Sequence, residues 1–112
     1  MQTALHSFKA GVFQALAHPT RVAIVELLRD GELSAGAIQE RLGIEQANLS
    51  QHLAVLRSRQ LVVNRKEGNQ VFYCLRDQML VEVLDIMRRY FMTHLAAVAE
   101  LLGEISAEAR TR

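Results

Sequence analysis

The stretch IEQANLSQHLAVLRSRQLV, residues 44–62, decides the fold of this chain. It begins as an amphipathic helix, with Leu49, Leu53 and Leu56 at helical spacing, and it ends in a β-branched run. The opposite side of the helix is small or uncharged and carries Ala47, Gln51, Ala54 and Ser58. Because solvated helix faces are usually charged, this face is suited to contact something other than water.

The segments before this stretch predict three short helices. Apolar periodicity predicts the first over residues 4–17, and Pro19 suits the first helical position of the second. A brief extended link over residues 31–34 follows. Ser34 is the expected N-cap of the third helix, which stops at Gly43, a favourable residue for a helix C-terminus.

A β-hairpin is predicted after the quoted helix. The runs LVVNRK (61–66) and QVFYCL (70–75) are rich in β-branched and aromatic residues. The intervening EGN is typical of a tight hairpin turn, with Gly68 and Asn69 available for positive φ. The predicted fold class is therefore mainly α with a β-hairpin.

A long helix is predicted over about 77–104, with Asp77 as its cap. Its apolar positions wrap much of the circumference and include Leu80, Leu84, Met87, Phe91, Leu95, Val98 and Leu102. A chain of this size cannot cover such a helix, so we expect it to pair with a second copy, with the N-terminal helix as its companion. Residues 1–105 are thus predicted to form one domain, and residues 106–112 a frayed tail.

Composition restricts the class of protein. The chain has 112 residues, half of them hydrophobic, and a net charge of +1. Five basic residues and one acidic residue fall within 46–76, which favours an anionic partner for that segment. The absence of a membrane-spanning run and the single cysteine, Cys74, lead us to expect a cytoplasmic protein with no membrane partner.

These elements predict a winged helix-turn-helix, with the helix-turn-helix over about 34–58 and the wing over about 61–75. A helix that enters the major groove of DNA needs small side chains for close approach and amides that pair with base edges. Acidic side chains would be repelled by phosphates, and residues 46–60 contain none. The predicted DNA-binding residues are Gln46, Ala47, Asn48, Ser50, Gln51 and Arg57 on the helix, and Arg65, Lys66, Asn69 and Gln70 on the wing.

The sequence resembles the ArsR/SmtB-type winged-helix repressors of bacteria from about residue 13 to residue 75. The resemblance rests on Ala17-His18-Pro19 with Arg21, on Ser50-Gln51-His52-Leu53 leading to Leu56, and on Gly68 before Tyr73. It implies a homodimer, joined through its terminal helices, that binds an inverted-repeat operator in double-stranded DNA and is released when an effector is sensed. No motif identifies the effector.

The two metal sites that the resemblance implies are incomplete here. The segment that would hold a cysteine pair reads Glu32-Leu33-Ser34-Ala35-Gly36, without sulfur. The site on the last helix retains Asp77, but Met79, Tyr90 and Thr93 occupy the other ligand positions. One carboxylate does not hold a zinc ion, so we predict no metal cofactor, with a non-standard site at His6 or His94 as the alternative.

The sequence bears on three further function classes: redox switches, enzymes and protein-binding modules. Cys74 is expected to be a buried structural thiol, and a single-thiol redox switch is its alternative role. No nucleophile–base pair or phosphate-binding loop is present, which argues against an enzyme. A winged-helix module that binds a protein instead of DNA is the remaining rival, and its affinity would respond little to salt.

Overall fold

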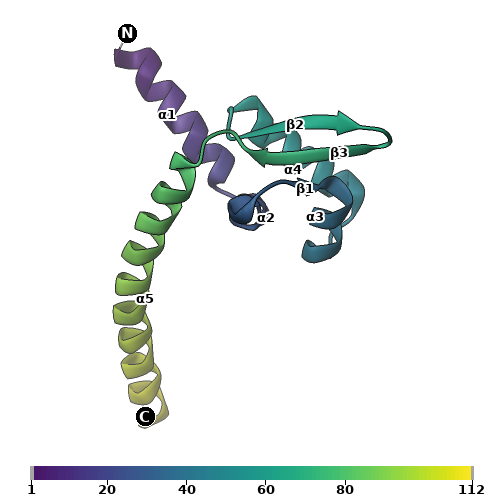
Figure 1. The fold of residues 1–112 in the computed structure, drawn as a ribbon. Coiled ribbons are helices and arrows are strands. Elements are labelled where there is room, and N and C mark those ends of the chain that lie inside the picture. The colour runs from purple at the N-terminus through teal and green to yellow at the C-terminus, as the bar shows by residue number, and fades with distance from the viewer. Residues whose placement is uncertain (1, 112) are drawn as a thin grey trace. The chain divides into compact units, whose positions relative to one another are not determined.

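The computed structural model describes residues 2–111 and divides the chain into two units, one extending to Val81 and one beginning at Glu82. In chain order (Figure 1) the elements are α1 (Gln2–Leu16), α2 (Pro19–Leu27), the 3₁₀ turn η1 (Leu28–Asp30), β1 (Leu33–Ser34), α3 (Ala35–Leu42), α4 (Gln46–Ser58), β2 (Val62–Glu67), β3 (Gln70–Leu75) and α5 (Met79–Thr111). The second unit consists of α5 from Glu82 onward.

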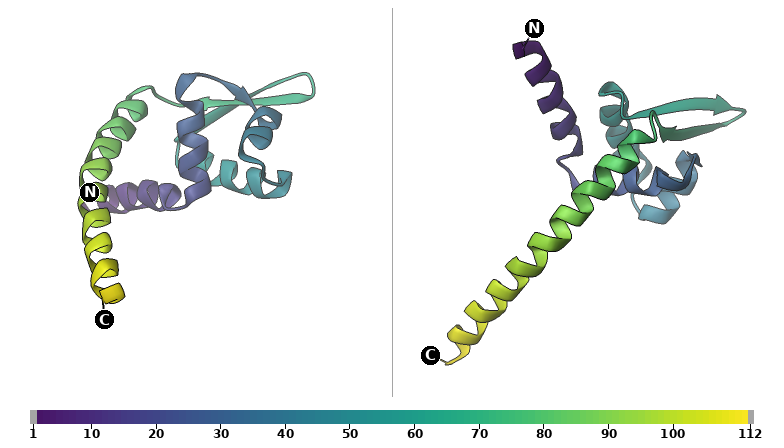
Figure 2. Two further views of the ribbon diagram at one scale, coloured as in Figure 1. Left: turned by 90° about the horizontal axis from the view of Figure 1, so that it is seen from below. Right: turned by 60° about the vertical axis from the view of Figure 1, so that its left-hand side comes forward.

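Helices α2, α3 and α4 pack against one another and against the sheet to form the core of the first unit. The predicted apolar stripe of α4 is confirmed, since Leu49, Leu53 and Leu56 are each no more than 2% exposed. The other buried apolar side chains are Ala15, Ile24, Val25, Leu28, Ile38, Leu61, Val62 and Leu75. In both views of Figure 2 the β2–β3 hairpin projects beyond these helices, as expected of a wing.

The predicted helix ends are confirmed at four places. Pro19 begins α2, as predicted, and His18 before it caps the helix, its Nδ1 accepting a hydrogen bond from the Thr20 amide at 3.1 Å. Ser34 caps α3 in the same way through the Ala37 amide, and Gly43 ends that helix in the left-handed conformation. Asp77 accepts a hydrogen bond from the Met79 amide at 2.8 Å, at the start of α5.

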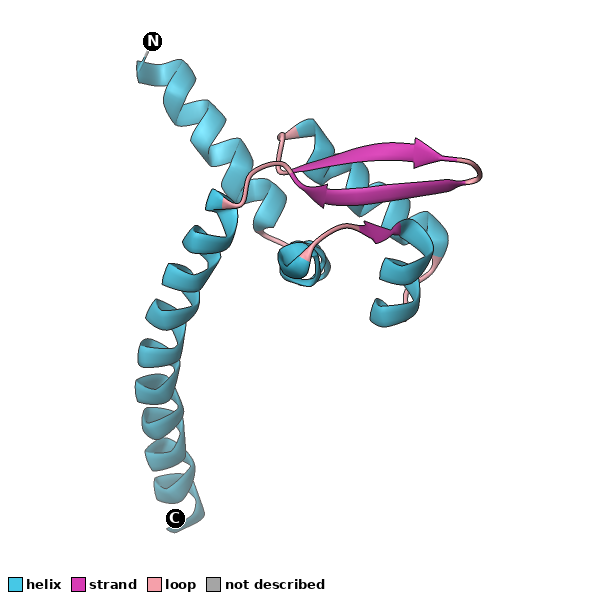
Figure 3. Ribbon diagram, viewed as in Figure 1, coloured by secondary structure: helices cyan, strands magenta, loops and turns pink. Residues whose placement is uncertain are grey.

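The sheet has three antiparallel strands in the order β1-β3-β2 (Figure 3). The link before α3, expected only to be extended, pairs with the wing, Leu33 opposite Tyr73 and Ser34 opposite Phe72. The hairpin turn is as tight as predicted, with Glu67 and Gln70 paired across it. Gly68 has the expected positive φ of 60°, but Asn69 does not have a positive φ. This pattern is that of a two-residue hairpin turn that needs glycine only at the first of its two central positions.

Helix α5 continues to Thr111, seven residues beyond the predicted end near 104 (111 − 104), so residues 106–111 are helical where a frayed tail is predicted. The segment SAEART is rich in good helix formers, and an isolated Gly103 inside a helix is tolerated. No helix within residues 2–111 has both the length and the apolar character needed to cross a bilayer.

Apolar side chains of α5 are exposed along its whole length. At least 38% of the surface is accessible at each of Val83, Ile86, Met87, Tyr90, Phe91, Met92, Leu95, Val98, Leu101, Leu102 and Ile105. Helix α1 similarly exposes Leu5, Phe8 and Phe13. An uncovered apolar surface of this extent is typical of a protein–protein interface.

Two arginines, Arg59 and Arg21, connect α1 to the rest of the first unit. The Arg59 guanidinium lies against the backbone of Gly11, so close that a Cβ placed on Gly11 would come within 2.7 Å of Arg59 Cζ. Arg21 donates hydrogen bonds to the carbonyl oxygens of Ala15 and Gln14 at the end of α1. These bonds satisfy backbone acceptors that a helix C-terminus otherwise leaves unpaired.

The C-terminus of α4 is closed by a Schellman motif built on a residue other than glycine. The Leu61 amide donates to Leu56 O and the Gln60 amide donates to Arg57 O, both at 3.0 Å. Gln60 therefore adopts the left-handed conformation, with φ 64°, which costs any residue with a Cβ more than it costs glycine. Arg76 donates a hydrogen bond to the Gln60 side chain at this exposed position.

We predict that Gln60→Gly raises the free energy of unfolding by roughly 0.5–1 kcal/mol, because it relieves the left-handed strain. Gln60→Ala is the matched control, since it removes the same amide but keeps the Cβ, and it should not stabilise the protein. Urea denaturation at one fixed protein concentration measures both. Equal effects of the two variants would contradict the assignment of strain to φ.

Candidate nucleic-acid interface

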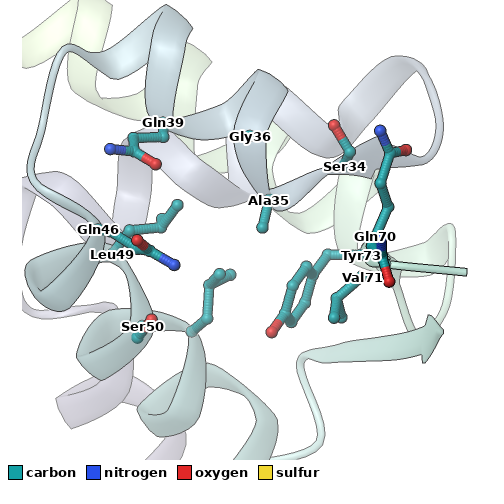
Figure 4. Close-up of a pocket in the computed structure, with 12 residues that line it drawn as sticks. Ser34, Ala35, Gly36, Gln39, Gln46, Leu49, Ser50, Gln70, Val71 and Tyr73 are labelled. Carbon is teal, nitrogen blue, oxygen red and sulfur yellow. The ribbon is translucent and has the colours of Figure 1, made fainter.

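A groove of about 410 Å³ lies between the first turn of α3, the first two turns of α4 and the tip of the hairpin (Figure 4). Its polar lining consists of Ser34, Gln39, Gln46, Ser50, Asn69, Gln70 and Tyr73, and none of its lining side chains is charged. The structure thus brings together four residues that the sequence predicts for DNA binding, two from α4 and two from the hairpin.

Three polar lining residues, Ser34, Gln39 and Tyr73, were missed from the sequence. Ser34 and Gln39 reach the groove because β1 joins the sheet and brings α3 beside the wing, a pairing that two residues of sequence do not signal. Tyr73 could have been found from strand alternation, since it shares the helix-facing side of β3 with Val71 and the buried Leu75.

The other predicted residues of α4 lie on its exposed surface outside the groove lining. Ala47, Asn48 and Gln51 are exposed along the first turns, and Arg57 is exposed in the last turn. No side chain caps the N-terminus of α4, where Glu45 precedes Gln46. The first amides of α4 are therefore not bonded by a capping side chain, and the positive end of the helix dipole lies at the groove.

Arg65 is held on the exposed outer face of the sheet by two carboxylates. Its guanidinium donates two hydrogen bonds to Glu32, at 2.8 and 2.7 Å, and one to Glu67 at 2.6 Å. It also lies over the ring of Phe72, with Cζ 4.6 Å from the ring centroid. Arg65 on β2 thus reaches over the middle strand to the residue that precedes β1, and ties the three strands together on the outer face of the sheet.

The pKa values of this pair follow from the contact. The Arg65 hydrogen bonds lower the pKa of Glu32, and those from Glu32 and Glu67 raise the pKa of Arg65. Both groups therefore stay ionised at neutral pH, and the positive charge of Arg65 is compensated locally.

Lys66 has the opposite orientation from Arg65. Strand alternation puts it on the face of the sheet that bears Val71, its pairing partner and a groove residue. Among residues 2–111 no carboxylate lies within ion-pair distance of its ammonium group. Of the two cations predicted for the wing, Lys66 is the one whose charge is uncompensated beside the groove.

A histidine pair connects α4 with the start of α2. The rings of His18 and His52 have centroids 4.4 Å apart, and Arg21 Nη1 lies 3.3 Å from His52 Nδ1. Partial burial lowers the pKa of His52 below its ordinary value of 6.5, and the neighbouring His18 and Arg21 lower it further. The neutral imidazole of His52 is therefore favoured in the folded protein.

The remaining sequence candidates are not among the residues that line the groove. Cys74, expected to be buried, is half-buried on the outer face of the sheet opposite Val63. His6 is exposed on α1, and the His94 ring packs at a tilt of 48° against Tyr90, with ring centroids 4.3 Å apart. Within residues 2–111 no three His, Cys, Asp or Glu side chains are close enough together to hold a metal ion.

Comparison with known proteins agrees with this geometry. A family model described as a helix-turn-helix domain matches residues 16–65. The homodimeric winged helix-turn-helix DNA-binding domain of Mb0332 from Mycobacterium bovis, described as a possible ArsR-family transcriptional regulator, is 30% identical and superposes with a TM-score of 0.78 over 84% of this chain and 87% of its own. The chain belongs to the ArsR family of winged helix-turn-helix regulators.

Other relatives, named as transcriptional regulators, also match most of the chain. The HTH-type transcriptional regulator Rv0081 of Mycobacterium tuberculosis is 35% identical over 92% of this chain and 91% of its own length. Its crystal structure has a TM-score of 0.77 over 83% of this chain and 94% of the other. The transcriptional activator HlyU of Vibrio cholerae is 40% identical over 77% of this chain and 81% of its own, and its structure has a TM-score of 0.70. The members are transcriptional regulators rather than enzymes.

We predict that the stability of this ArsR-family protein falls as the pH is lowered through 6.5 and below, because of His52. Its pKa is lower in the folded than in the unfolded state, so the unfolded chain binds the proton first and acid favours unfolding. Urea denaturation at several pH values measures this dependence. His52→Gln, whose amide can still accept from Arg21, should weaken it, whereas His6→Gln on the exposed face of α1 should not. Identical pH profiles for the wild type and His52→Gln would contradict the prediction.

Proposed function

We propose that this protein is a homodimeric transcriptional repressor that binds an inverted-repeat operator in double-stranded DNA. Each protomer inserts α4 into a major groove and lays its wing along the adjacent backbone. The observation that carries the proposal is the groove between α4 and the hairpin, which joins four predicted DNA-binding residues in a surface without acidic side chains.

The exposed face of α4 is suited to reading bases. Ala47 allows the helix to approach the floor of the major groove, and the amides of Asn48 and Gln51 can donate to and accept from adenine N6 and N7. The exposed Arg57, at the other end of α4, is assigned to a phosphate contact. Gln46, Ser50, Asn69 and Gln70 line the groove where the sugar–phosphate backbone would pass.

The exposed apolar side chains of α5 and α1 support the proposed dimer, in which a second copy of the chain would cover them. Phe91, Leu95, Val98, Leu102 and Ile105 repeat at alternating spacings of four and three residues along α5, the pattern of a helix–helix seam. Mb0332, which has the same fold, is a homodimer. A dimer would present two α4 helices about 34 Å apart, and a palindromic operator follows from its twofold symmetry.

Repression follows from occupancy, since a dimer bound across a promoter excludes other proteins from the same DNA. Relatives of this chain are named both as repressors and as an activator. Reporter expression from the promoter upstream of its own gene distinguishes the two signs. Expression that rises when the gene is deleted supports repression, and expression that falls indicates activation.

The DNA-binding test uses the full chain with duplexes selected from a random pool. We expect one dimer to bind a palindromic site with an affinity that falls steeply as salt is raised. Gln51→Ala should lose about 1–3 kcal/mol and relax preference at one base pair in each half-site. A monomer, or a protein without salt-dependent DNA binding, would instead support the protein-interaction module.

We predict that Lys66→Ala reduces the salt dependence of DNA binding by about one ion per protomer, without changing base preference. The matched control removes the Arg65–Glu32 pair as a unit, with Arg65→Gln and Glu32→Gln together, and should change the slope little because that pair is already neutral overall. Slopes of log affinity against log salt measure both. A larger loss of slope in the control would show that Arg65, not Lys66, is the cation that contacts phosphate.

A further inference from the structure

The groove beside α4 offers hydrogen-bond donors without formal charge. Tyr73, Ser50 and Gln70 line it from the two sides, and each has a hydroxyl or an amide that can donate to an anionic oxygen. Since no carboxylate or cationic side chain lines this groove, an anion placed in it would be bound by dipoles alone. This is a different kind of contact from the one assigned to Lys66.

Tyr73 is the most firmly positioned of these donors. It lies on β3, the middle strand, with Asn64 opposite it on β2 and Leu33 opposite it on β1. Strand pairing on both sides holds the backbone of Tyr73 in place, so the position of its Cα atom is fixed. The exposed residues at the hairpin tip are not paired on both sides and are less firmly positioned.

The Tyr73 hydroxyl has no partner inside the protein. Figure 4 shows the ring projecting into the groove with the hydroxyl at its free end. No group among residues 2–111 forms a hydrogen bond with this hydroxyl. The oxygen is not buried either, because no buried polar side-chain atom of the described residues is left unsatisfied. The donor is therefore available to a bound molecule.

We propose that the Tyr73 hydroxyl donates a hydrogen bond to a phosphate oxygen of the DNA backbone that runs between α4 and the wing. Ser50 and Gln70 are the other uncharged hydrogen-bond donors that would face this part of the backbone. The inference rests on the proposed function and adds a residue that fixes the position of the backbone without reading sequence. It predicts a specific thermodynamic signature, because a neutral donor contributes affinity without adding to the number of counterions released.

The test is Tyr73→Phe in the full-length protein, which removes only an oxygen that makes no internal bond and so leaves the fold intact. We expect roughly threefold to tenfold weaker binding to the selected operator, with an unchanged salt slope and unchanged base preference. Ser106→Ala, which removes an exposed hydroxyl near the C-terminal end of α5, is the control and should bind as the wild type does. Thermal denaturation of both variants should coincide with that of the wild type.

A second measurement locates the phosphate. Operators that carry one uncharged methylphosphonate linkage at each backbone position in turn are bound by the wild type and by Tyr73→Phe. At one linkage in each half-site, the difference between the two proteins should vanish.

Three results overturn the inference: wild-type affinity in Tyr73→Phe, a shallower salt slope in that variant, or a difference that persists at every linkage. Failure of the wild type itself to bind DNA would instead refute the proposed function.

Discussion

The burial of three leucines on one side of α4 is the constraint on which the rest of this structure depends. Leu49, Leu53 and Leu56 are each no more than 2% exposed, on a helix that packs against α2, α3 and β2, and each contributes roughly 1.5–3 kcal/mol of apolar burial. Turning α4 about its axis would bring these side chains into water, so its rotation is fixed. The opposite face of α4 therefore points away from the core, whatever residues it carries. The packing of the core thus determines which face of α4 is exposed.

The electrostatics of the wing depend on which charges are already paired. Counted along the sequence, residues 46–76 form a basic segment with five cations. In the structure Arg65 is bound by Glu32 and Glu67, Arg76 bonds to Gln60, and Arg59 lies against α1. Much of the positive charge therefore has a structural role. One lysine and a set of neutral hydrogen-bond donors remain beside the groove. In the proposed complex, directional hydrogen bonds would fix the position of the DNA backbone more than long-range charge attraction would.

Local sequence patterns predict the elements of this fold well because their causes are local. The caps at His18 and Ser34, the stop at Gly43 and the turn at Gly68 each depend on residues within a few positions of one another. The apolar stripe of α4 is likewise visible in a single helix. Four of the groove residues follow from the same reasoning, since surface residues of a recognition helix and of a hairpin tip can be assigned once those elements are recognised.

The features that the sequence did not reveal depend on contacts between distant positions. Glu32 and Arg65 are 33 residues apart, and only the pairing of β1 with β3 brings them together. The same pairing adds Ser34 and Gln39 to the groove. Strand β1 has only two residues, too few for an alternating pattern that would predict this pairing from the sequence. The left-handed Gln60 was equally hidden, because glycine is the usual signal for that conformation.

The close approach of Gly11 to Arg59 has a mechanical consequence. Turning α1 about its own axis would replace the glycine at this point by a neighbour with a side chain, and the guanidinium at the end of α4 would have to leave. The helix that exposes Leu5, Phe8 and Phe13 is therefore in direct contact with the residue that follows α4. A displacement of α1 along or about its axis would therefore disturb the side chain of this residue, so the positions of the two helices are coupled through a single contact.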